Sequence, residues 1–258
     1  MGIGKEDRYL NYSLIIYVVG AVFLGSLMRS TFGFGDSVVS MPLLALLPIP
    51  FSTAVSLVAL VGFTVALFSL FSGWKRLDLN VLKRLTLSTI AGIPVGLLLV
   101  AFAERTWVDL FLGLLLVLYA GYSLVSASRT NHSIQQTVSR PGYAIPFGFS
   151  SGMLGSAYNM NGIPVVLYGT MRNWTPDEFK DNIQAHFLIS SILIVLSHFL
   201  SGFWTQELGL YYILSLPVII MAIKLGDIIY SRIQVEKFKT IVLIIILLLG
   251  LFMLASLI

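Results

Sequence analysis

Polar side chains gather in residues 29–42 of an otherwise apolar chain, and their types suit the binding of a small anion. Arg29 can donate charge-assisted hydrogen bonds as a planar fork. Hydroxyl groups that can also donate hydrogen bonds belong to Ser30, Thr31, Ser37 and Ser40. The segment therefore predicts half of an anion-binding site.

A second polar segment, residues 150–164, carries donors of the same kind. These donors are Ser156, Tyr158, Asn159 and Asn161. Gly33 and Gly155 each stand nine residues before a proline, Pro42 and Pro164. The paired placement favours a binding site over the alternative, in which small and polar residues only pack membrane helices together.

Helix starts at these two segments would strengthen the attraction for an anion. A helix that begins after a break presents free N–H groups and the positive end of its dipole. The predicted starts are residues 36–40 and 158–162. The predicted break residues are Gly33, Pro42, Gly155, Gly162 and Pro164, and the backbone at Gly33 and Gly35 is expected to face the site.

Asp36 allows two interpretations, because a carboxylate beside an anion repels it unless the acid is protonated or paired. Asp36 either caps the new helix and pairs with Arg29, or carries a proton that is coupled to the function of the site. Asn182 and Gln184, at the start of a later apolar run, are further candidates to reach the site.

The composition places these segments in an integral membrane protein. Of the 258 residues, 57% are hydrophobic and 11% are charged, and the mean hydropathy is +0.91. Soluble domains contain about 45 to 50% apolar residues. Both charge signs occur in residues 1–9, unlike a cleavable signal, so the first apolar run is expected to remain as a membrane helix.

Seven apolar runs reach the length of about 20 residues that a membrane-spanning helix needs. They lie near residues 10–28, 53–71, 82–103, 107–125, 183–203, 208–230 and 238–258. An eighth run, residues 143–154, is expected to be interrupted at Gly148 and Gly152. Two pieces, residues 38–47 and 163–168, are too short to cross alone as ordinary helices.

The spacing of Gly33 and Pro42, matched by Gly155 and Pro164, indicates an internal repeat of about 120 residues. Gly96 and Gly226 also correspond. The predicted units are a first repeat at residues 1–126, a cytoplasmic linker at residues 127–140 and a second repeat at residues 141–258. Each repeat is expected to contain about four full-length transmembrane helices and one short broken helix.

Loop charges indicate that the two repeats have inverted topology. Residues 75–84 carry four basic side chains, whereas the equivalent residues 205–207 carry none, and cytoplasmic loops are enriched in Lys and Arg. Five crossings in each half place these two loops on opposite sides. The basic loops at residues 75–84, 127–140, 171–182 and 231–237 then lie inside, while Lys5 and Arg8 do not fit this placement.

Other chemistry is poorly supported. The absence of cysteine excludes disulfides and thiolate sites, and the three histidines are not at a ligand spacing, so neither a metal nor another cofactor is expected. His186 and His198 are expected to be packing residues rather than a proton relay. The segment Gly148-Phe149-Ser150-Ser151-Gly152 matches a nucleophile pattern, but a membrane segment is the wrong context, so an enzyme is not predicted.

The two segments resemble the sulfite exporter TauE/SafE family of membrane permeases. The likeness rests on Gly33-Phe34-Gly35 followed by Pro42, and on Gly155 followed by Gly162-Ile163-Pro164, and it covers almost the whole chain. The resemblance implies a secondary transporter of small sulfur-containing anions, such as sulfite, thiosulfate or organosulfonates. It also implies export across a bacterial plasma membrane.

The sequence thus predicts an all-α polytopic membrane protein of two inverted repeats. An anion would be held between the two broken segments near the membrane midplane and exposed to alternate sides, with a possible proton coupling at Asp36. The alternatives are a passive anion channel on the same scaffold and a non-transporting membrane scaffold or enzyme. The expected partners are a small anion and the lipid bilayer, not nucleic acid, and the oligomeric state is left open.

Overall fold

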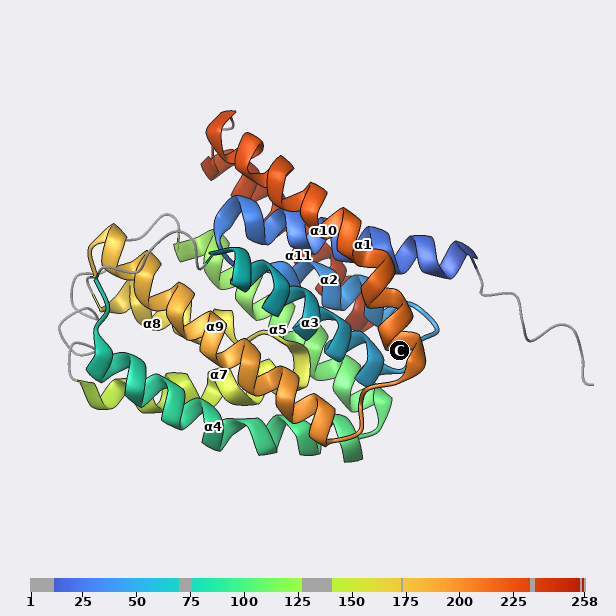
Figure 1. The fold of residues 1–258 in the computed structure, drawn as a ribbon, viewed down its shortest axis with the longest axis horizontal. Helices are drawn as coiled ribbons and strands as arrows, with labels where there is room; N and C mark the ends of the chain where they lie inside the picture. The colour runs from blue at the N-terminus through green and yellow to red at the C-terminus, as the bar shows by residue number, and fades with distance from the viewer. Residues whose placement is uncertain are drawn as a thin grey trace, which may run out of the picture.

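Helices are the only regular elements in the part of the chain that the computed structural model describes, residues 12–69, 76–126, 141–172, 174–232, 235–255 and 257 (Figure 1). The first half contains α1 (Tyr12–Phe32), α2 (Asp36–Ala45), α3 (Phe51–Ser69), α4 (Leu79–Phe102) and α5 (Arg105–Ser126). The second half contains η3 (Pro141–Tyr143), α7 (Ala144–Tyr158), α8 (Gly162–Met171), α9 (Pro176–Leu200), α10 (Gln206–Arg232) and α11 (Val235–Ala255). The prediction of an all-α protein is confirmed.

In the described part of the chain, six helices are long and apolar enough to cross a membrane. They are α1, α3, α4, α5, α9 and α10, which correspond to six of the seven predicted full-length spans. The seventh span, predicted at residues 238–258, falls on α11, whose described apolar part is the shorter Ile246–Ala255. The predicted linker at residues 127–140, Lys5 and Arg8 lie outside the described residues.

The predicted interruption of the eighth run is wrong, because α7 continues from Ala144 to Tyr158 through Gly148 and Gly152. These glycines serve packing instead. A Cβ on Gly152 would overlap the carbonyl oxygen of Thr89 in α4, and a Cβ on Gly148 would overlap the carbonyl oxygen of Leu85. Small residues of this kind let membrane helices approach to backbone contact.

Each of the two short helices, α2 and α8, follows a break in the chain. The first break has two glycines in the left-handed region, Gly33 with a φ of 81° and Gly35 with a φ of 93°. The second break has Asn159, with a φ of 55°. Asparagine adopts this conformation more readily than most residues with a side chain. The break predicted at Gly33 is confirmed.

The other predicted break residues are placed differently. Gly155 lies inside α7, where a Cβ would come within 2.6 Å of Ile194 Cδ1, so glycine is needed there for packing. Pro42 lies inside α2. Pro164 is in the first turn of α8. N–H groups in a first turn have no acceptor within the helix, so a proline there removes no helical hydrogen bond. Gly162 is the first residue of α8, directly after the break.

When the two halves are aligned by the first residues of their short helices, the alignment differs from the one that the glycine and proline spacing predicted. α2 and α8 each have 10 residues, so their first residues, Asp36 and Gly162, correspond. Gly33 then corresponds to Asn159, about one helical turn after the predicted Gly155. Both residues have a positive φ. The register set by the helix boundaries therefore differs by four residues from the register set by the glycine and proline spacing.

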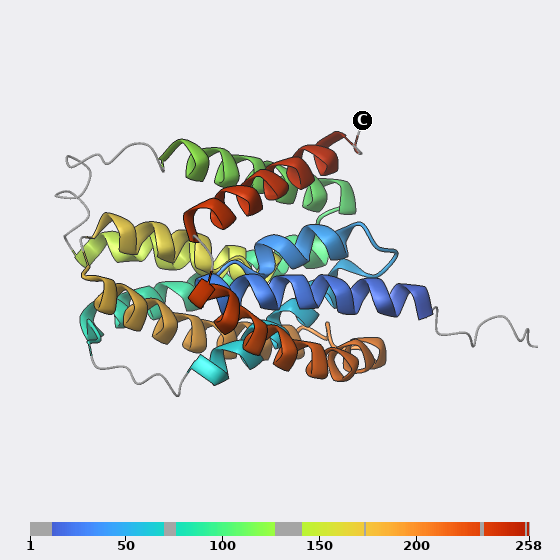
Figure 2. The ribbon, with the colours of Figure 1, turned by 90° about the horizontal axis from the view of Figure 1, so that it is seen from above.

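Helices of the two halves pair in a regular way. α1 packs along α10, and α4 packs along α7. α3 packs against α9, and α5 against α11, which cross on one side of the molecule in Figure 2. If α1 to α5 correspond in order to α7 to α11, exchanging the halves converts the α1–α10 pair into the α7–α4 pair and the reverse. The same exchange leaves the α3–α9 and α5–α11 pairs unchanged.

The helix ends show where the basic residues gather. In Figure 1, α4, α7 and α9 begin at the left end of the molecule, whereas α1 and α10 begin at the right end. Lys83 and Arg84 belong to the first turns of α4, and Arg172 lies between α8 and α9. These basic residues therefore share one end of the molecule.

The starts of two long helices are closed by side-chain caps. The Asp78 carboxylate accepts a hydrogen bond from the Val81 N–H at 3.1 Å at the start of α4. At the start of α9, Thr175 and Glu178 form a capping box. Hydrogen bonds from the backbone N–H and then the hydroxyl of Thr175 hold the pKa of Glu178 below its ordinary value.

Candidate functional site

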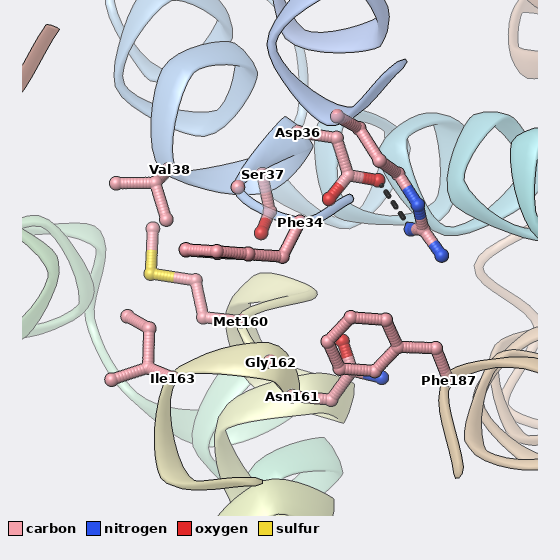
Figure 3. Close-up of a pocket in the computed structure, with 11 residues that line it drawn as sticks. Phe34, Asp36, Ser37, Val38, Met160, Asn161, Gly162, Ile163 and Phe187 are labelled. Atoms are coloured by element: carbon pink, nitrogen blue, oxygen red, sulfur yellow. Dashed lines mark hydrogen bonds and ion pairs between the residues drawn. The ribbon is translucent and has the colours of Figure 1, made fainter. Parts of the chain in front are cut away.

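The starts of α2 and α8 line one small cavity, which we call the α2–α8 cavity (Figure 3). Its volume is about 10 Å³, which leaves room for about one water molecule. Arg29 of α1 and Phe187 of α9 complete the lining. The residues contributed by the two helix starts are Phe34, Gly35, Asp36, Ser37, Val38, Met160, Asn161, Gly162 and Ile163.

Neither helix start at this cavity is capped by a side chain. The N-cap residues of α2 and α8 are Gly35 and Asn161, and neither makes a side-chain capping hydrogen bond. Asn161 instead donates from Nδ2 to the Ser190 hydroxyl at 2.6 Å. The first N–H groups of two helices and the positive ends of their dipoles are thus available at one place, which favours an anion.

Arg29 and Asp36 form a buried ion pair beside the two helix starts. Nη1 of Arg29 donates to Oδ2 of Asp36 at 2.8 Å, and the side chains are 6% and 7% exposed. The Arg29 guanidinium also lies over the Phe187 ring, 5.4 Å from its centroid. Nη2 of Arg29 is buried and has no hydrogen-bond partner in the described part of the chain. Because an unpaired buried donor is costly, the energetics at Nη2 favour the entry of a hydrogen-bond acceptor.

Of the two interpretations of Asp36, the ion pair with Arg29 is present. The capping role is wrong, because the N-cap is Gly35 and Asp36 is the first residue of α2. A negative charge at this position still interacts favourably with the helix dipole.

Gly62 of α3 is part of the site, although the sequence did not single it out. A Cβ at Gly62 would lie 2.9 Å from Oδ2 of Asp36, 3.1 Å from Nη1 of Arg29 and 3.2 Å from Nδ2 of Asn159. The ion pair and the second break therefore meet at a position where α3 has no side chain. A glycine within an apolar run carries no sequence signal for this role.

Three predicted donors of the first half lie outside the cavity lining. Ser30 and Thr31 donate to carbonyl oxygens one turn earlier in α1, at 2.7 and 2.8 Å. The Ser40 hydroxyl donates to the Ala21 carbonyl oxygen of α1 at 3.0 Å. The hydroxyl protons of all three residues are thus used by backbone carbonyl groups in this conformation, and only the Ser40 bond joins two helices.

Three predicted donors of the second half are also used elsewhere. The Ser156 hydroxyl donates to a carbonyl oxygen of α4 at 2.8 Å, and the Tyr158 hydroxyl to one of α5 at 3.2 Å. Nδ2 of Asn159 donates to a carbonyl oxygen of α3 at 3.1 Å. The predicted site residues that do line the cavity are Arg29, Gly35, Asp36, Ser37 and Asn161, together with the predicted break residue Gly162.

Gln184 of α9 supports the first break. Its Nε2 donates to the carbonyl oxygen of Gly33 at 3.1 Å, while its Oε1 is buried without a hydrogen-bond partner among the described residues. This contact satisfies a backbone acceptor that the break removes from the helix. Phe34 and Phe187 are site residues that the sequence did not suggest, because two phenylalanines among 17 carry no distinctive signal.

Asn182 takes part in a second polar cluster, at the end where the basic residues gather. Arg172 donates to Oδ2 of Asp78 at 2.9 Å and to the Tyr168 hydroxyl at 3.0 Å. The Asn182 side chain accepts from the Asp78 N–H at 2.8 Å and donates to the Arg76 carbonyl oxygen at 3.1 Å. This cluster ties the start of α4 in the first half to α8 and α9 in the second half.

The histidines and the nucleophile-like segment have structural environments. Nε2 of His186 lies 3.1 Å from the Thr89 hydroxyl, and Nε2 of His198 lies 2.9 Å from the Ser156 carbonyl oxygen. Both rings thus bridge helices, as predicted for packing residues. Ser150 lies within α7, without the strand and sharp turn that a nucleophile of this pattern needs.

Comparison with known proteins adds a match over most of the chain. A family model described as sulfite exporter TauE/SafE matches residues 18–253, a range that includes both breaks and every residue of the cavity lining. Searches of curated proteins and of solved structures found no match.

Proposed function

Because the chain belongs to the sulfite exporter TauE/SafE family, we propose that it is a secondary transporter that exports sulfite, thiosulfate or organosulfonates across a bacterial plasma membrane. The family is one of membrane anion transporters, and six long apolar helices agree with this placement. The anion is held in the α2–α8 cavity once that cavity has widened.

The observation that carries this proposal is the unpartnered Nη2 of Arg29 beside two uncapped helix starts. The charges of Arg29 and Asp36 offset each other, so the helix dipoles, each worth about half a positive charge, set the sign of the potential. A sulfonate or sulfite presents three oxygen atoms. These oxygens can accept from Nη2 and from N–H groups of both helices at the same time.

The size of the cavity supports a carrier rather than an open pore. A volume of about 10 Å³ holds about one water molecule, so surrounding helices must move before a sulfur oxyanion enters. Movement of one half against the other would expose the site to alternate sides. The interchange of α1 with α7 and of α10 with α4 in the helix pairs supports a two-fold relation between the halves. In Figure 1, α1 and α10 begin at the end opposite to α7 and α4, which supports an inverted arrangement of the two repeats.

Asp36 is proposed to couple anion binding to a proton. When Asp36 is ionised, it holds Nη1 of Arg29 at 2.8 Å. Protonation would release both terminal nitrogens of Arg29 for the anion. In wild-type protein, anion affinity should therefore rise as the pH falls, and Asp36→Asn should remove this dependence. A variant that transported normally with the wild-type pH profile would rule out the coupling.

The substrate is tested with purified protein in proteoliposomes. Binding and transport of sulfite, thiosulfate and a panel of sulfonates are measured in parallel, and saturable uptake is expected for at least one of them. If none of these anions binds, while Arg29→Lys leaves the transport of a different solute intact, the proposal is wrong. Flux that rises in proportion to concentration without saturation would instead indicate a passive channel.

Two serines of α2 provide a matched test of the site. Ser37 lines the cavity, whereas Ser40 bonds to α1. Ser37→Ala should weaken anion binding about threefold to tenfold, as expected for one lost hydrogen bond. Ser40→Ala should leave the affinity unchanged and lower only the thermal stability. Equal affinities in the two variants would place the anion elsewhere.

A further inference from the structure

A surface groove between α4 and α7 combines a basic end with an apolar length. Its volume is about 870 Å³. Lys83 and Arg84 lie at the basic end, and Leu87, Ile145 and Phe149 line the apolar part. These three apolar side chains are 57%, 51% and 38% exposed, so the groove faces the surroundings of the protein and not its core.

The groove follows from the close contact of the two helices. A Cβ on Gly92 of α4 would overlap the carbonyl oxygen of Phe149, and one on Gly152 of α7 would overlap that of Thr89. The backbones therefore touch, and larger side chains are displaced to the flanks of the contact. Because α4 and α7 both begin at the left end in Figure 1, the basic end lies at two helix starts.

The basic charges of the groove have no ion-pair partner among the described residues. Lys83 and Arg84 are exposed, and neither is a member of the ion pairs found in the described residues. The groove lining contains no Asp or Glu. Asp78, a short distance earlier in the chain, is already paired with Arg172 at 2.9 Å. No acidic side chain in the described part of the chain is therefore placed to neutralise the basic end, which suits an anionic partner.

We propose that this groove binds an anionic phospholipid. The phosphate contacts Lys83 and Arg84, and one acyl chain lies along Leu87, Ile145 and Phe149. Lys83 and Arg84 lie nearer the helix starts than Leu87 and Phe149, so the basic and apolar parts follow the order of headgroup and chain in a bilayer. Basic pockets between membrane helices on the cytoplasmic side bind anionic headgroups in this way. The site does not depend on which anion the protein transports.

The binding of phosphatidylglycerol and of phosphatidylcholine with the same acyl chains is compared by native mass spectrometry of the full-length protein in detergent. Phosphatidylglycerol should bind more tightly. Lys83→Ala and Arg84→Ala should each lower its affinity about fivefold, as expected for a basic residue near an anionic lipid. Lys224→Ala, which removes an exposed positive charge from α10, serves as the control and should have no effect. An equal loss in all three variants would show a nonspecific charge effect and overturn the proposal.

The apolar part of the groove is tested separately. Ala91→Trp fills the groove, whereas Ala101→Trp changes an exposed alanine of the same helix outside it. Only the first should reduce phosphatidylglycerol binding, and both should elute as single species with similar thermal midpoints. Glycerol phosphate should not compete at the concentrations where the lipid binds. If it competes as well as the lipid, the groove is a phosphate site and the lipid assignment is wrong.

Discussion

Gly62 is the residue at which three separate segments meet. Arg29 of α1, Asp36 of α2 and Asn159 of the second break would all lie within 3.2 Å of a Cβ at this position. The missing side chain lets the ion pair rest against the backbone of α3. Nη1 of Arg29 is held by Asp36 against this position of α3. The backbone of α3 at Gly62 therefore helps to fix where the other terminal nitrogen, Nη2, lies.

We expect Gly62→Ala to lower anion affinity about tenfold, because the new methyl group displaces one charge-assisted hydrogen bond worth about 1.5 kcal/mol. The neighbours are the ends of side chains, so the fold should persist. Isothermal titration with the transported anion measures the effect. Gly121→Ala, where a Cβ meets nothing within 4 Å, is the control. Wild-type affinity in Gly62→Ala would show that the ion pair does not position the anion.

At the scale of helices, glycine has two separate functions in this protein. Gly33 and Gly35 end α1 and start α2 through backbone angles that other residues avoid. Gly92 and Gly152 lie within continuous helices and allow α4 and α7 to touch. Of these four glycines, only Gly33 and Gly35 form a chain break, after which the uncapped start of α2 presents its free N–H groups.

Gly33→Ala should destabilise the protein by about 1 to 2 kcal/mol, because alanine is strained at a φ of 81°. Gly33→Asn should cost less, since asparagine tolerates this conformation at the corresponding position, Asn159. Unfolding in mixed detergent and dodecyl sulfate micelles gives the free energies. Gly20→Ala, inside α1 with no atom within 4 Å of the new Cβ, should be neutral or slightly stabilising. Equal stabilities of the two alanine variants would contradict the strain.

Gly152→Ala should destabilise the protein by about 3 kcal/mol, because its Cβ overlaps the Thr89 backbone carbonyl, which cannot turn away as a side chain does. The same unfolding measurement applies. The matched control is Gly209→Ala in α10, where a Cβ meets nothing within 4 Å. A stable Gly152→Ala variant would mean that α4 and α7 do not pack in backbone contact.

At the scale of the whole molecule, the two halves meet at the α2–α8 cavity and are also joined at one end by the cluster of Arg172, Asp78 and Asn182. The cavity holds about one water molecule, so this conformation is closed around the site. A transport cycle would require the contacts between the halves to rearrange.

The placement of the helix ends predicts which residues face each side of the membrane. The chain contains no cysteine, so one introduced thiol is unique. Asn80→Cys, at the start of α4, should react with an impermeant maleimide only after the cells are opened. Thr205→Cys, just before α10, should react in intact cells. Both positions are exposed. Labelling of both from the same side would contradict the proposed topology.

The sequence by itself determined the membrane class, the helical fold, the two polar segments and the family resemblance. These features depend on the length of apolar runs and on local composition, which are properties of the chain read in order. Four of the candidate residues that it named, Arg29, Asp36, Ser37 and Asn161, line one cavity in the structure. The ion pair between the first two follows from their opposite charges and short separation.

The tertiary structure alone decided which polar groups remain available. Ser30, Ser40 and Ser156 looked equivalent to Ser37, but a neighbouring helix or the preceding turn supplies each of them with a carbonyl oxygen. The second break was predicted at Gly155 but lies at Asn159 in the structure. Gly155 is needed for packing against Ile194, whereas the left-handed backbone angle occurs at Asn159. Gly62 gained its role from three segments that are distant in the sequence. Apart from the Ser30 bond within α1, the deciding contacts join helices whose pairing no local pattern encodes.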